Sequence, residues 1–150
     1  MKILLDTNIV LRNAIRTDPQ HPQVHQALAR LVRDGWELCI GTQNVIEFWV
    51  VATRPTNVNG LGLSPRQAEV EVKALLGAFT LLADPDDLID RWLDLCARYG
   101  VSGRPAHDAR LVAVMLSHGI KHLLTLNVAD FTRYAERISD PGTRNARIGG

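Results

Sequence analysis

The chain alternates between short apolar runs and longer segments whose apolar residues recur at helical spacing. Apolar runs typical of fully buried strands lie at 2–5, 36–40, 79–82 and 122–126. Helical patterns, many with Pro or Gly at an end, lie at 7–16, 21–34, 42–52, 64–77, 85–99 and 106–118, and a short helical turn is expected at 129–134. Strands that are apolar throughout and separated by helices predict an α/β fold, a three-layer α/β/α sandwich with a central parallel sheet.

Capping residues mark several predicted helix starts. Thr7 and Asn8 are expected to cap the first helix and Thr42 the third. Ser64, with Gln67 three residues later, forms a capping box for the fourth. Five Asp crowd into 84–94, where Asp84 is expected to cap a helix whose first turn begins at 85 and whose acidic face is solvated.

Length and composition indicate one domain spanning 1–150 with a core of its own, because 46% of the residues are hydrophobic and 22% are charged. No apolar run approaches the roughly 20 residues of a membrane span, and Asp6 interrupts the start that a signal peptide would need. Cys39 and Cys96 lack metal-ligand spacing and fit buried thiols in a reducing compartment. We therefore expect a soluble cytoplasmic chain.

The charge balance excludes a nonspecific nucleic-acid coat protein, because seventeen basic against sixteen acidic residues leave a net charge of only +1. Fourteen of the bases are Arg, whose planar guanidinium suits phosphates and carboxylates. Four of these lie in the last eighteen residues: Arg133, Arg137, Arg144 and Arg147.

Polar residues at predicted strand ends are the first candidates for a site, because parallel sheets bind ligands at the carboxyl ends of their strands. Asp6 ends the first run, and Thr125, Asn127 and Asp130 lie at or just past the last. A carboxylate directly after a buried run is poorly solvated unless a positive group meets it. Asp6 is therefore either a helix cap or a ligand for a cation.

Two helical acids add to this set. Glu47 lies on the helical segment 44–52, which is apolar nearly all round, so it should be buried and either bind a cation or pair with an arginine. The available arginines are Arg12, Arg54 and Arg110. Asp108 lies at the start of the sixth predicted helix, where its alternative role is to stabilise the positive end of the helix dipole. The alternative role of Asp130 is that of a turn residue. Taken jointly, four such acids are what an oxygen-rich site for Mg²⁺ or Mn²⁺ needs.

Four segments resemble, in order, the motifs of PIN-domain ribonucleases: LLDTN at 4–8, NVIEFWVVATRP at 44–55, AHDARLVA at 106–113 and TLNVADF at 125–131. The TRP segment with the following NGLGLS resembles bacterial VapC-type toxins of type II toxin–antitoxin pairs. The resemblance implies an acidic quartet of catalytic and metal-binding residues, Asp6, Glu47, Asp108 and Asp130, with support from Thr7, Thr125 and Asn127. Many relatives have an acid where Asn127 stands, so a second metal should be held more weakly or through Asp130.

The resemblance also implies an activity: a metal-dependent endoribonuclease, with Mg²⁺ or Mn²⁺, that hydrolyses RNA phosphodiester bonds and inhibits translation as a toxin. RNA, a cognate antitoxin and a second copy of the chain are the implied partners. One alternative is a PIN-fold module that binds RNA or a protein without cleavage. Another is a metal-dependent phosphatase, although no second carboxylate stands two residues after Asp6 and no glycine-rich phosphate loop is present.

Three surface expectations follow. Arginines near the motif acids should gather around the site: Arg12, Arg16, Arg54, Arg104 and Arg110. An antitoxin should dock beside the first helices and 54–63 on exposed apolar residues, with these candidates: Ile9, Val10, Phe48 and Val51. A homodimer should form through the helices of 64–100, whose apolar residues are Val70, Val72, Leu75, Leu76, Leu88, Ile89, Trp92, Leu93 and Leu95.

Overall fold

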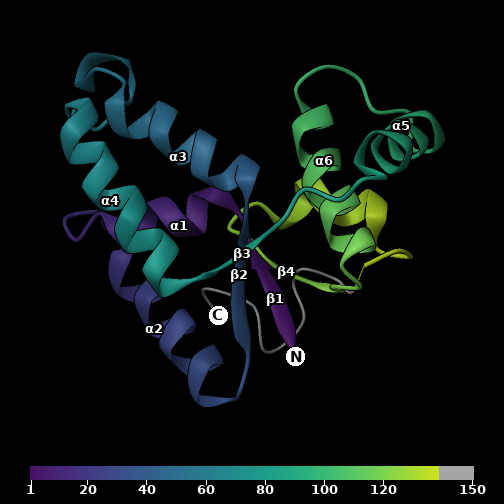
Figure 1. Cartoon of the computed structure of the whole chain (residues 1–150), viewed down its shortest axis with the longest axis horizontal. Helices are drawn as coiled ribbons and strands as arrows, with labels where there is room; N and C mark the ends of the chain where they lie inside the picture. Colours follow the sequence, from purple (N-terminus) through teal and green to yellow (C-terminus); the bar gives the residue numbers. More distant parts are fainter. Residues whose placement is uncertain (139–150) are drawn as a thin grey trace.

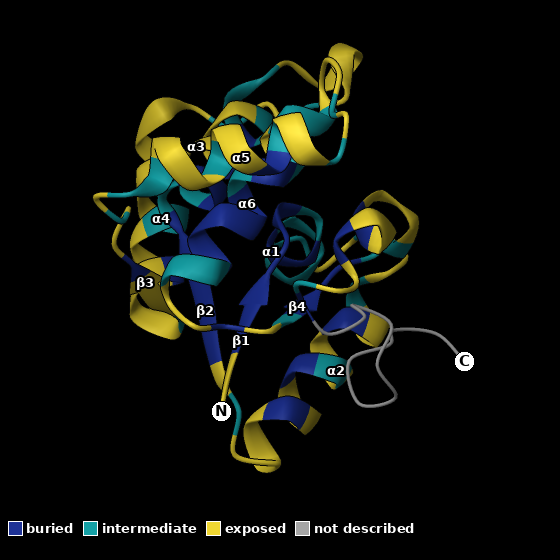
Figure 2. Ribbon diagram, turned by 90° about the vertical axis from the view of Figure 1, so that its right-hand side faces the viewer, coloured by how far each residue is buried: buried dark blue, intermediate teal, exposed yellow. Residues whose placement is uncertain are grey.

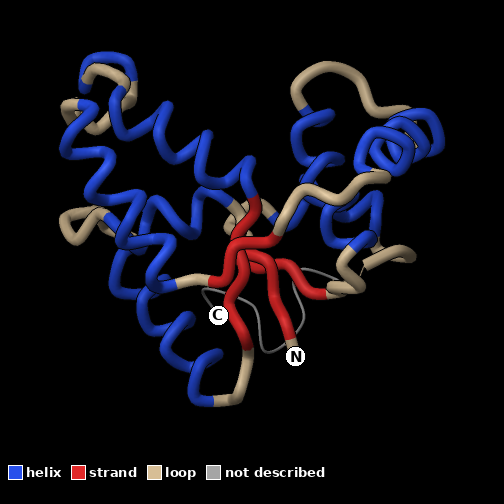
Figure 3. Tube along the Cα trace, in the orientation of Figure 1, coloured by secondary structure: helices blue, strands red, loops and turns tan. Residues whose placement is uncertain are grey.

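The computed structural model describes residues 1–138, which form the predicted parallel sheet covered on both faces. Its strands are β1 (Lys2–Leu5), β2 (Glu37–Gly41), β3 (Thr80–Leu82) and β4 (His122–Leu124), in the order β3-β2-β1-β4. Each neighbouring pair is parallel, and Figure 3 shows the strands together between the two groups of helices. The carboxyl ends of all four strands therefore lie at the same edge of the sheet.

Helices form the outer two layers (Figure 1). On one face lie α1 (Thr7–Ala14), α2 (His21–Arg33), α3 (Thr42–Thr53) and α4 (Pro65–Ala78). On the other lie α5 (Leu88–Arg98), α6 (Pro105–Ser117) and the short 3-10 helix η2 (Val128–Tyr134), while η1 (Thr56–Val58) follows α3. Within residues 1–138, no helix has both the length and the apolar character that crossing a bilayer requires.

The two cores are separated by the sheet, whose interior is buried in Figure 2. Ile3 and Leu5 of β1 pack with the α1–α4 layer, whereas Leu4 between them packs with Ala109 and Val112 of α6. All three strand residues have no exposed surface. Successive side chains of β1 point to opposite faces of the sheet, and helices cover both faces. These three positions are therefore all buried, which is why they form a continuous apolar run in the sequence.

Element bounds agree with the sequence prediction to within one to three residues, and the differences have local causes. The Ser64–Gln67 capping box is present as predicted. Thr42 is the first residue of α3 rather than its cap, because β2 stays paired through Gly41, whose N–H donates to Oδ1 of Asn44 at 2.7 Å. The first helix is capped by Asp6 rather than by Thr7 or Asn8, because an oxygen of Asp6 accepts from the Thr7 N–H.

The predicted start of α5 was three residues too early. A turn closes at Leu88, whose N–H donates to the carbonyl oxygen of Pro85 at 3.1 Å, and the helix begins there. Asp84, the expected cap, instead pairs with Arg110 of α6 at 3.1 Å. Asp87 occupies the cap position, but its Oδ1 accepts from the Ser117 hydroxyl at 2.7 Å. Contacts with α6, which local sequence cannot show, thus decide where α5 begins.

The segment after α3 is fixed by backbone hydrogen bonds to that helix. The N–H groups of Leu61 and Leu63 donate to the carbonyl oxygens of Val51 and Ala52, each at 2.9 Å. The chain returns so closely that a Cβ on Gly60 would lie 1.9 Å from the carbonyl oxygen of Arg54. Glycine at position 60 is therefore required by this close approach.

The apolar surface differs from the sequence expectation. The antitoxin-docking prediction was wrong for Ile9, Val10 and Phe48, which are core residues because α1 and α3 turn these side chains toward the sheet. Of the residues predicted to form a dimer surface, Leu75 and Leu95 are also buried. Four others in that set are exposed: Val70, Leu76, Ile89 and Leu93.

Candidate active site

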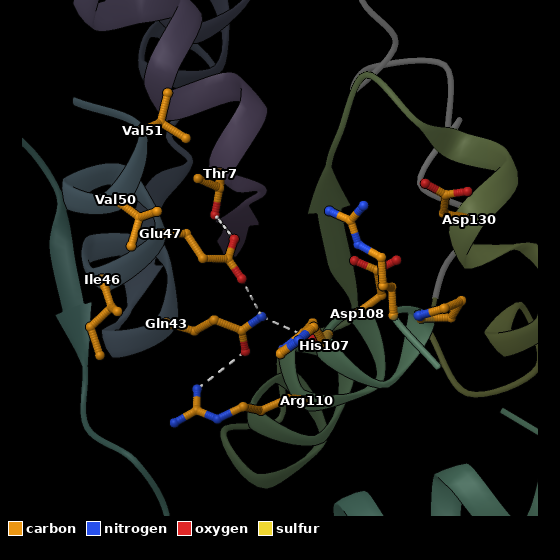
Figure 4. Close-up of a pocket in the computed structure, with 12 residues that line it drawn as sticks. Thr7, Gln43, Ile46, Glu47, Val50, Val51, His107, Asp108, Arg110 and Asp130 are labelled. Carbon is orange, nitrogen blue, oxygen red and sulfur yellow. Dashed lines mark hydrogen bonds between the residues drawn. The ribbon is translucent and has the colours of Figure 1, made fainter. Parts of the chain in front are cut away.

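A cleft of about 850 Å³ lies between α3 and α6 (Figure 4). Helix α3 lines it with Glu47, Ile46 and Val50, and α6 lines it with Asp108. The cleft also contains Asp130, which η2 supplies just past the end of β4. Its size is typical of a ligand-binding site.

Asp6 lies at the end of β1 and is 8% exposed. Its Oδ1 accepts from the Thr7 N–H at 2.8 Å, and its Oδ2 accepts from the Thr125 hydroxyl at 2.7 Å. The N–H of Asn127 donates in turn to the Thr125 hydroxyl oxygen at 3.0 Å. The pKa of Asp6 is raised, chiefly by burial. The hydrogen bonds from Thr125 and Thr7 oppose this rise in pKa, and the negative charges of Glu47 and Asp130 add to it. Asp6 is therefore a helix cap whose carboxylate also joins β1 to the segment after β4.

Glu47 does not form the expected ion pair with an arginine. Its Oε1 accepts from Gln43 Nε2 at 2.8 Å, and its Oε2 accepts from the Thr7 hydroxyl at 2.7 Å. The Asn44 amide nitrogen donates to the same Thr7 oxygen at 3.1 Å. Nor is this helix buried all round, because Ile46 is 58% exposed on the cleft wall. Two neutral donors thus fix the Glu47 carboxylate and leave its negative charge uncompensated.

Sequence reasoning missed Gln43 and Asn44, which are 7% and 0% exposed. The signal available was two adjacent polar residues at the start of an otherwise apolar helix. Buried polar side chains need hydrogen-bond partners, so such a pair indicates a network rather than ordinary core. That network reaches Glu47.

Asp108 and Asp130 face the cleft from the side opposite Glu47 (Figure 4). Neither carboxylate forms a hydrogen bond or ion pair with any other described side chain. Burial, followed by the negative charges of Asp6, Asp130 and Glu47, raises the pKa of Asp108 to about 6. The acids are thus close enough to repel one another through the cleft.

The structure brings the acidic quartet to one end of the sheet without forming a compact cluster. Across residues 1–138, no three His, Cys, Asp or Glu side chains come together closely enough to hold a metal ion as they stand. None of the four acids is in a salt bridge within that part of the chain. The donor set nevertheless fits a hard divalent cation in its chemistry, because it consists of carboxylate oxygens with unbalanced charge.

Two of the five arginines expected at the site line the cleft, Arg104 and Arg110. Arg12 instead pairs with Asp18 at 2.6 Å, and Arg54 donates to the carbonyl oxygen of Asn59 at 2.9 Å. Arg16 is exposed and does not line the cleft. Arg144 and Arg147 lie outside the described residues. Basic groups are therefore concentrated on the α6 side of the cleft.

Comparison with known proteins gives the chain a family and a fold. The family model described as PIN domain matches residues 3–137. A search of curated proteins finds no match.

Similar solved structures include one described as a toxin and two VapBC structures with bound DNA. VapC20 of Mycobacterium tuberculosis, described as a sarcin-ricin loop cleaving toxin, is 18% identical, with a TM-score of 0.64 over 92% of this chain and 97% of that one. DNA-bound VapBC from Salmonella typhimurium is 18% identical, with a TM-score of 0.65 over 93% and 94%. VapBC2 from Rickettsia felis, bound to a promoter DNA fragment, is 15% identical, with a TM-score of 0.64 over 93% and 95%.

The family match contains all four motif segments, and the solved structures share the α/β/α arrangement over nearly their whole length. At such low identities the structural likeness concerns the fold, whereas the family match concerns the sequence itself. The chain belongs to the PIN-domain family.

Proposed function

We propose that this chain is a metal-dependent endoribonuclease that hydrolyses RNA phosphodiester bonds. The supporting observation is that Glu47, Asp108 and Asp130 line one cleft beside the buried Asp6, and that burial and the other three acids raise the pKa of Asp108 to about 6. Such mutual repulsion is unfavourable for the empty site and is relieved when a cation binds. Perturbed carboxylates in a cleft also favour a functional over a structural role.

The acidic quartet would hold Mg²⁺ or Mn²⁺, supported by Thr7, Thr125 and the backbone of Asn127. When bound, the cation supplies charge neutralisation to the phosphodiester and lowers the pKa of the attacking water. The protein's own contribution is orientation. Thr125 and the Thr7 N–H fix Asp6, while Gln43 and the Thr7 hydroxyl fix Glu47.

RNA is the substrate that fits the rest of the cleft. Arg104 provides positive charge for the phosphate backbone on the α6 side, whereas Arg110 is already paired with Asp84. Ile46 and Val50 form an apolar wall opposite, against which an unstacked base can pack. Single-stranded or loop RNA presents such bases, whereas an A-form duplex keeps them stacked.

As a toxin of a type II pair, the chain would inhibit translation in the cytoplasm until an antitoxin binds it. Supporting this, the structures that share the fold include VapC20, which is described as a toxin, and two VapBC structures with bound DNA. An antitoxin segment would pack apolar side chains on Ile46 and Val50 and direct a basic group at the acids. A homodimer would form through the exposed Ile89 and Leu93 of α5.

One observation favours a second candidate, a PIN-fold module that binds RNA or a protein without cutting it. The acids do not form a compact cluster among residues 1–138, so closure around a cation requires side-chain movement. A site that never closes would bind without cleaving.

RNA cleavage by the purified chain tests the two candidates. We expect cleavage of a loop-containing RNA with Mg²⁺ or Mn²⁺, none with EDTA, and a loss of at least about 100-fold, or roughly 3 kcal/mol, in Asp108→Asn. Asp90→Asn removes a carboxylate from an exposed position of α5 and should keep parental activity. RNA binding without cleavage under every metal condition would favour the second candidate.

A further inference from the structure

A hydrogen-bond relay joins the two walls of the cleft through Gln43. Its Nε2 donates both to Glu47 Oε1 and to the carbonyl oxygen of His107, each at 2.8 Å. Its Oε1 accepts from Nη1 of Arg110 at 3.2 Å, and Nη2 of Arg110 is held by Asp84 Oδ2 at 3.1 Å. The relay therefore runs from Asp84, on the segment after β3, through Arg110 of α6 to the acid on α3, and Figure 4 shows its part from Arg110 to Glu47.

The partners of Gln43 fix the direction of its amide. A guanidinium only donates hydrogen bonds, whereas a carboxylate and a backbone carbonyl oxygen only accept them. Turning the amide over would place two donors against each other at Arg110, and acceptors against acceptors at Glu47 and His107. Arg110 thus holds Nε2 toward Glu47, although it does not contact Glu47 in this structure.

Nε2 of Gln43 forms hydrogen bonds with residues on both walls of the cleft, α3 and α6. One hydrogen bond positions the Glu47 carboxylate, and the other positions the backbone of the residue directly before Asp108. Gln43 is 7% exposed, and both hydrogen bonds are partly buried at the wall of the cleft. The Thr7 hydroxyl also holds Glu47, but only the Gln43 amide links Glu47 to the backbone beside Asp108.

We propose that Gln43, oriented by Arg110, is a positioning residue that sets Glu47 against Asp108 and so controls divalent-cation affinity and the rate of cleavage. The role in cleavage rests on the proposed function, whereas the role in cation affinity does not require RNA. A purely structural Gln43 would instead fill space between α3 and α6. Gln43→Met distinguishes these roles, because methionine keeps a similar length and volume but cannot form the amide hydrogen bonds.

The relay itself is tested by NMR on the full chain. The Gln43 side-chain amide, identified by its loss in Gln43→Met, should exchange with solvent more slowly than that of the exposed Gln26. In Arg110→Met this signal should shift and exchange faster. An unchanged Gln43 signal in Arg110→Met would overturn the relay.

The role of the relay is tested with Mn²⁺ alone, by calorimetry in the absence of RNA. Residues that orient metal ligands typically change affinity or activity about 10- to 100-fold when replaced, and we expect a loss in that range for Gln43→Met. The double variant with Arg110→Met should lose no more than the worse single variant, since both act through one amide. Gln26→Met and Arg30→Met, separately and together, provide the control on the exposed side of α2.

Cleavage kinetics complete the test. Gln43→Met should lower kcat about 10- to 100-fold while changing KM less than about twofold, with an unfolding midpoint close to that of the parent. Parental Mn²⁺ affinity and kcat in Gln43→Met would overturn the proposal while leaving the nuclease function intact. A parent that binds Mn²⁺ but does not cut RNA would overturn the proposed function, and the Mn²⁺ affinity of Gln43→Met would still decide the positioning role. A parent that binds no Mn²⁺ would overturn both.

Discussion

The Thr125 hydroxyl donates to Oδ2 of Asp6 at 2.7 Å, although 119 positions separate the two residues in the chain. The pairing of β1 with β4 brings them together, because Leu5 lies opposite Leu124 and each polar residue directly follows its strand. Thr125 is 3% exposed, so this hydrogen bond is made inside the protein. It lowers the pKa of Asp6 against the effect of burial.

Thr125→Val should therefore weaken both the fold and the site. The substitution keeps the shape but leaves the Asp6 oxygen and the Asn127 N–H without their partner, at a cost of about 1–3 kcal/mol in the free energy of unfolding. The pKa of Asp6 should rise further, and RNA cleavage should fall about tenfold or more. Denaturant unfolding and cleavage rates measure both, with the exposed Thr17→Val as control. Equal effects at the two positions would contradict a specific role for Thr125.

Asp6→Asn should abolish metal-dependent cleavage without unfolding the chain. The amide oxygen can still accept from the Thr7 N–H, and the Thr125 hydroxyl can turn to accept from the amide nitrogen. The variant removes one of the mutually repelling charges, so its thermal midpoint in metal-free buffer should equal or exceed that of the parent. Cleavage at the parental rate with Mg²⁺ or Mn²⁺ would exclude Asp6 from the site.

Asp108→Asn should stabilise the metal-free chain in a pH-dependent way. The pKa of Asp108 is raised to about 6 in the folded state from a model-peptide value of 3.8, so the folded state binds more protons between these values. The free energy of unfolding of the parent should therefore fall as the pH rises from 3.8 through about 6. That of Asp108→Asn should not fall for this reason, because position 108 no longer titrates. Allowing for solvent screening, we expect a gain of about 1 kcal/mol, or roughly 2–4 °C, at pH 8 and none at pH 3.5.

Calorimetric melting at both pH values measures this difference, with Asp90→Asn as the control on an exposed helix face. Adding Mn²⁺ at pH 8 should raise the parental midpoint more than that of Asp108→Asn, because a ligand that binds only the folded state stabilises it. An advantage of Asp108→Asn that is larger at pH 3.5 than at pH 8 would contradict the assigned cause.

Gly60→Ala should destabilise the chain by about 1–3 kcal/mol, because the new Cβ would lie 1.9 Å from the Arg54 carbonyl oxygen and force the segment after α3 to move. Gly77→Ala is the matched control. It lies within α4 with nothing inside 4 Å of its Cβ position, so it should stabilise by about 0.5–1 kcal/mol. Urea unfolding of both variants gives the two free energies, and the opposite order would contradict the close approach at Gly60.

Ile89→Glu should prevent dimer formation. Ile89 is 67% exposed and lies one turn from Leu93, which is 58% exposed, so both present apolar surface on one side of α5. Light scattering should return twice the 16.6 kDa chain mass for the parent and 16.6 kDa for the variant. Val32→Glu is the control. Val32 is 57% exposed and lies on α2, outside the proposed interface, so this variant should remain a dimer. A parent with the mass of one chain would refute the dimer.

Local sequence determined most of the elements, because hydrophobic periodicity and capping act between neighbouring residues. The Ser64–Gln67 capping box and the buried run of β1 were predicted for this reason and are confirmed. The sequence also located two of the candidate acids, Asp6 and Asp130, at or just past strand ends. Parallel strands share their carboxyl edge, so Asp6 and Thr125, which directly follow β1 and β4, lie at the same edge, whereas the position of Asp130 depends on η2.

Tertiary structure alone decided what surrounds those acids and which helix faces meet solvent. Glu47 is held by Gln43, one turn earlier on α3, and by Thr7 of α1 rather than by an arginine, because α3 packs beside α1. The same packing buries Ile9 and exposes Ile46, although both are isoleucines in apolar stretches. Burial and long-range hydrogen bonds depend on the relative placement of whole elements, and periodicity within one element carries no information about that placement.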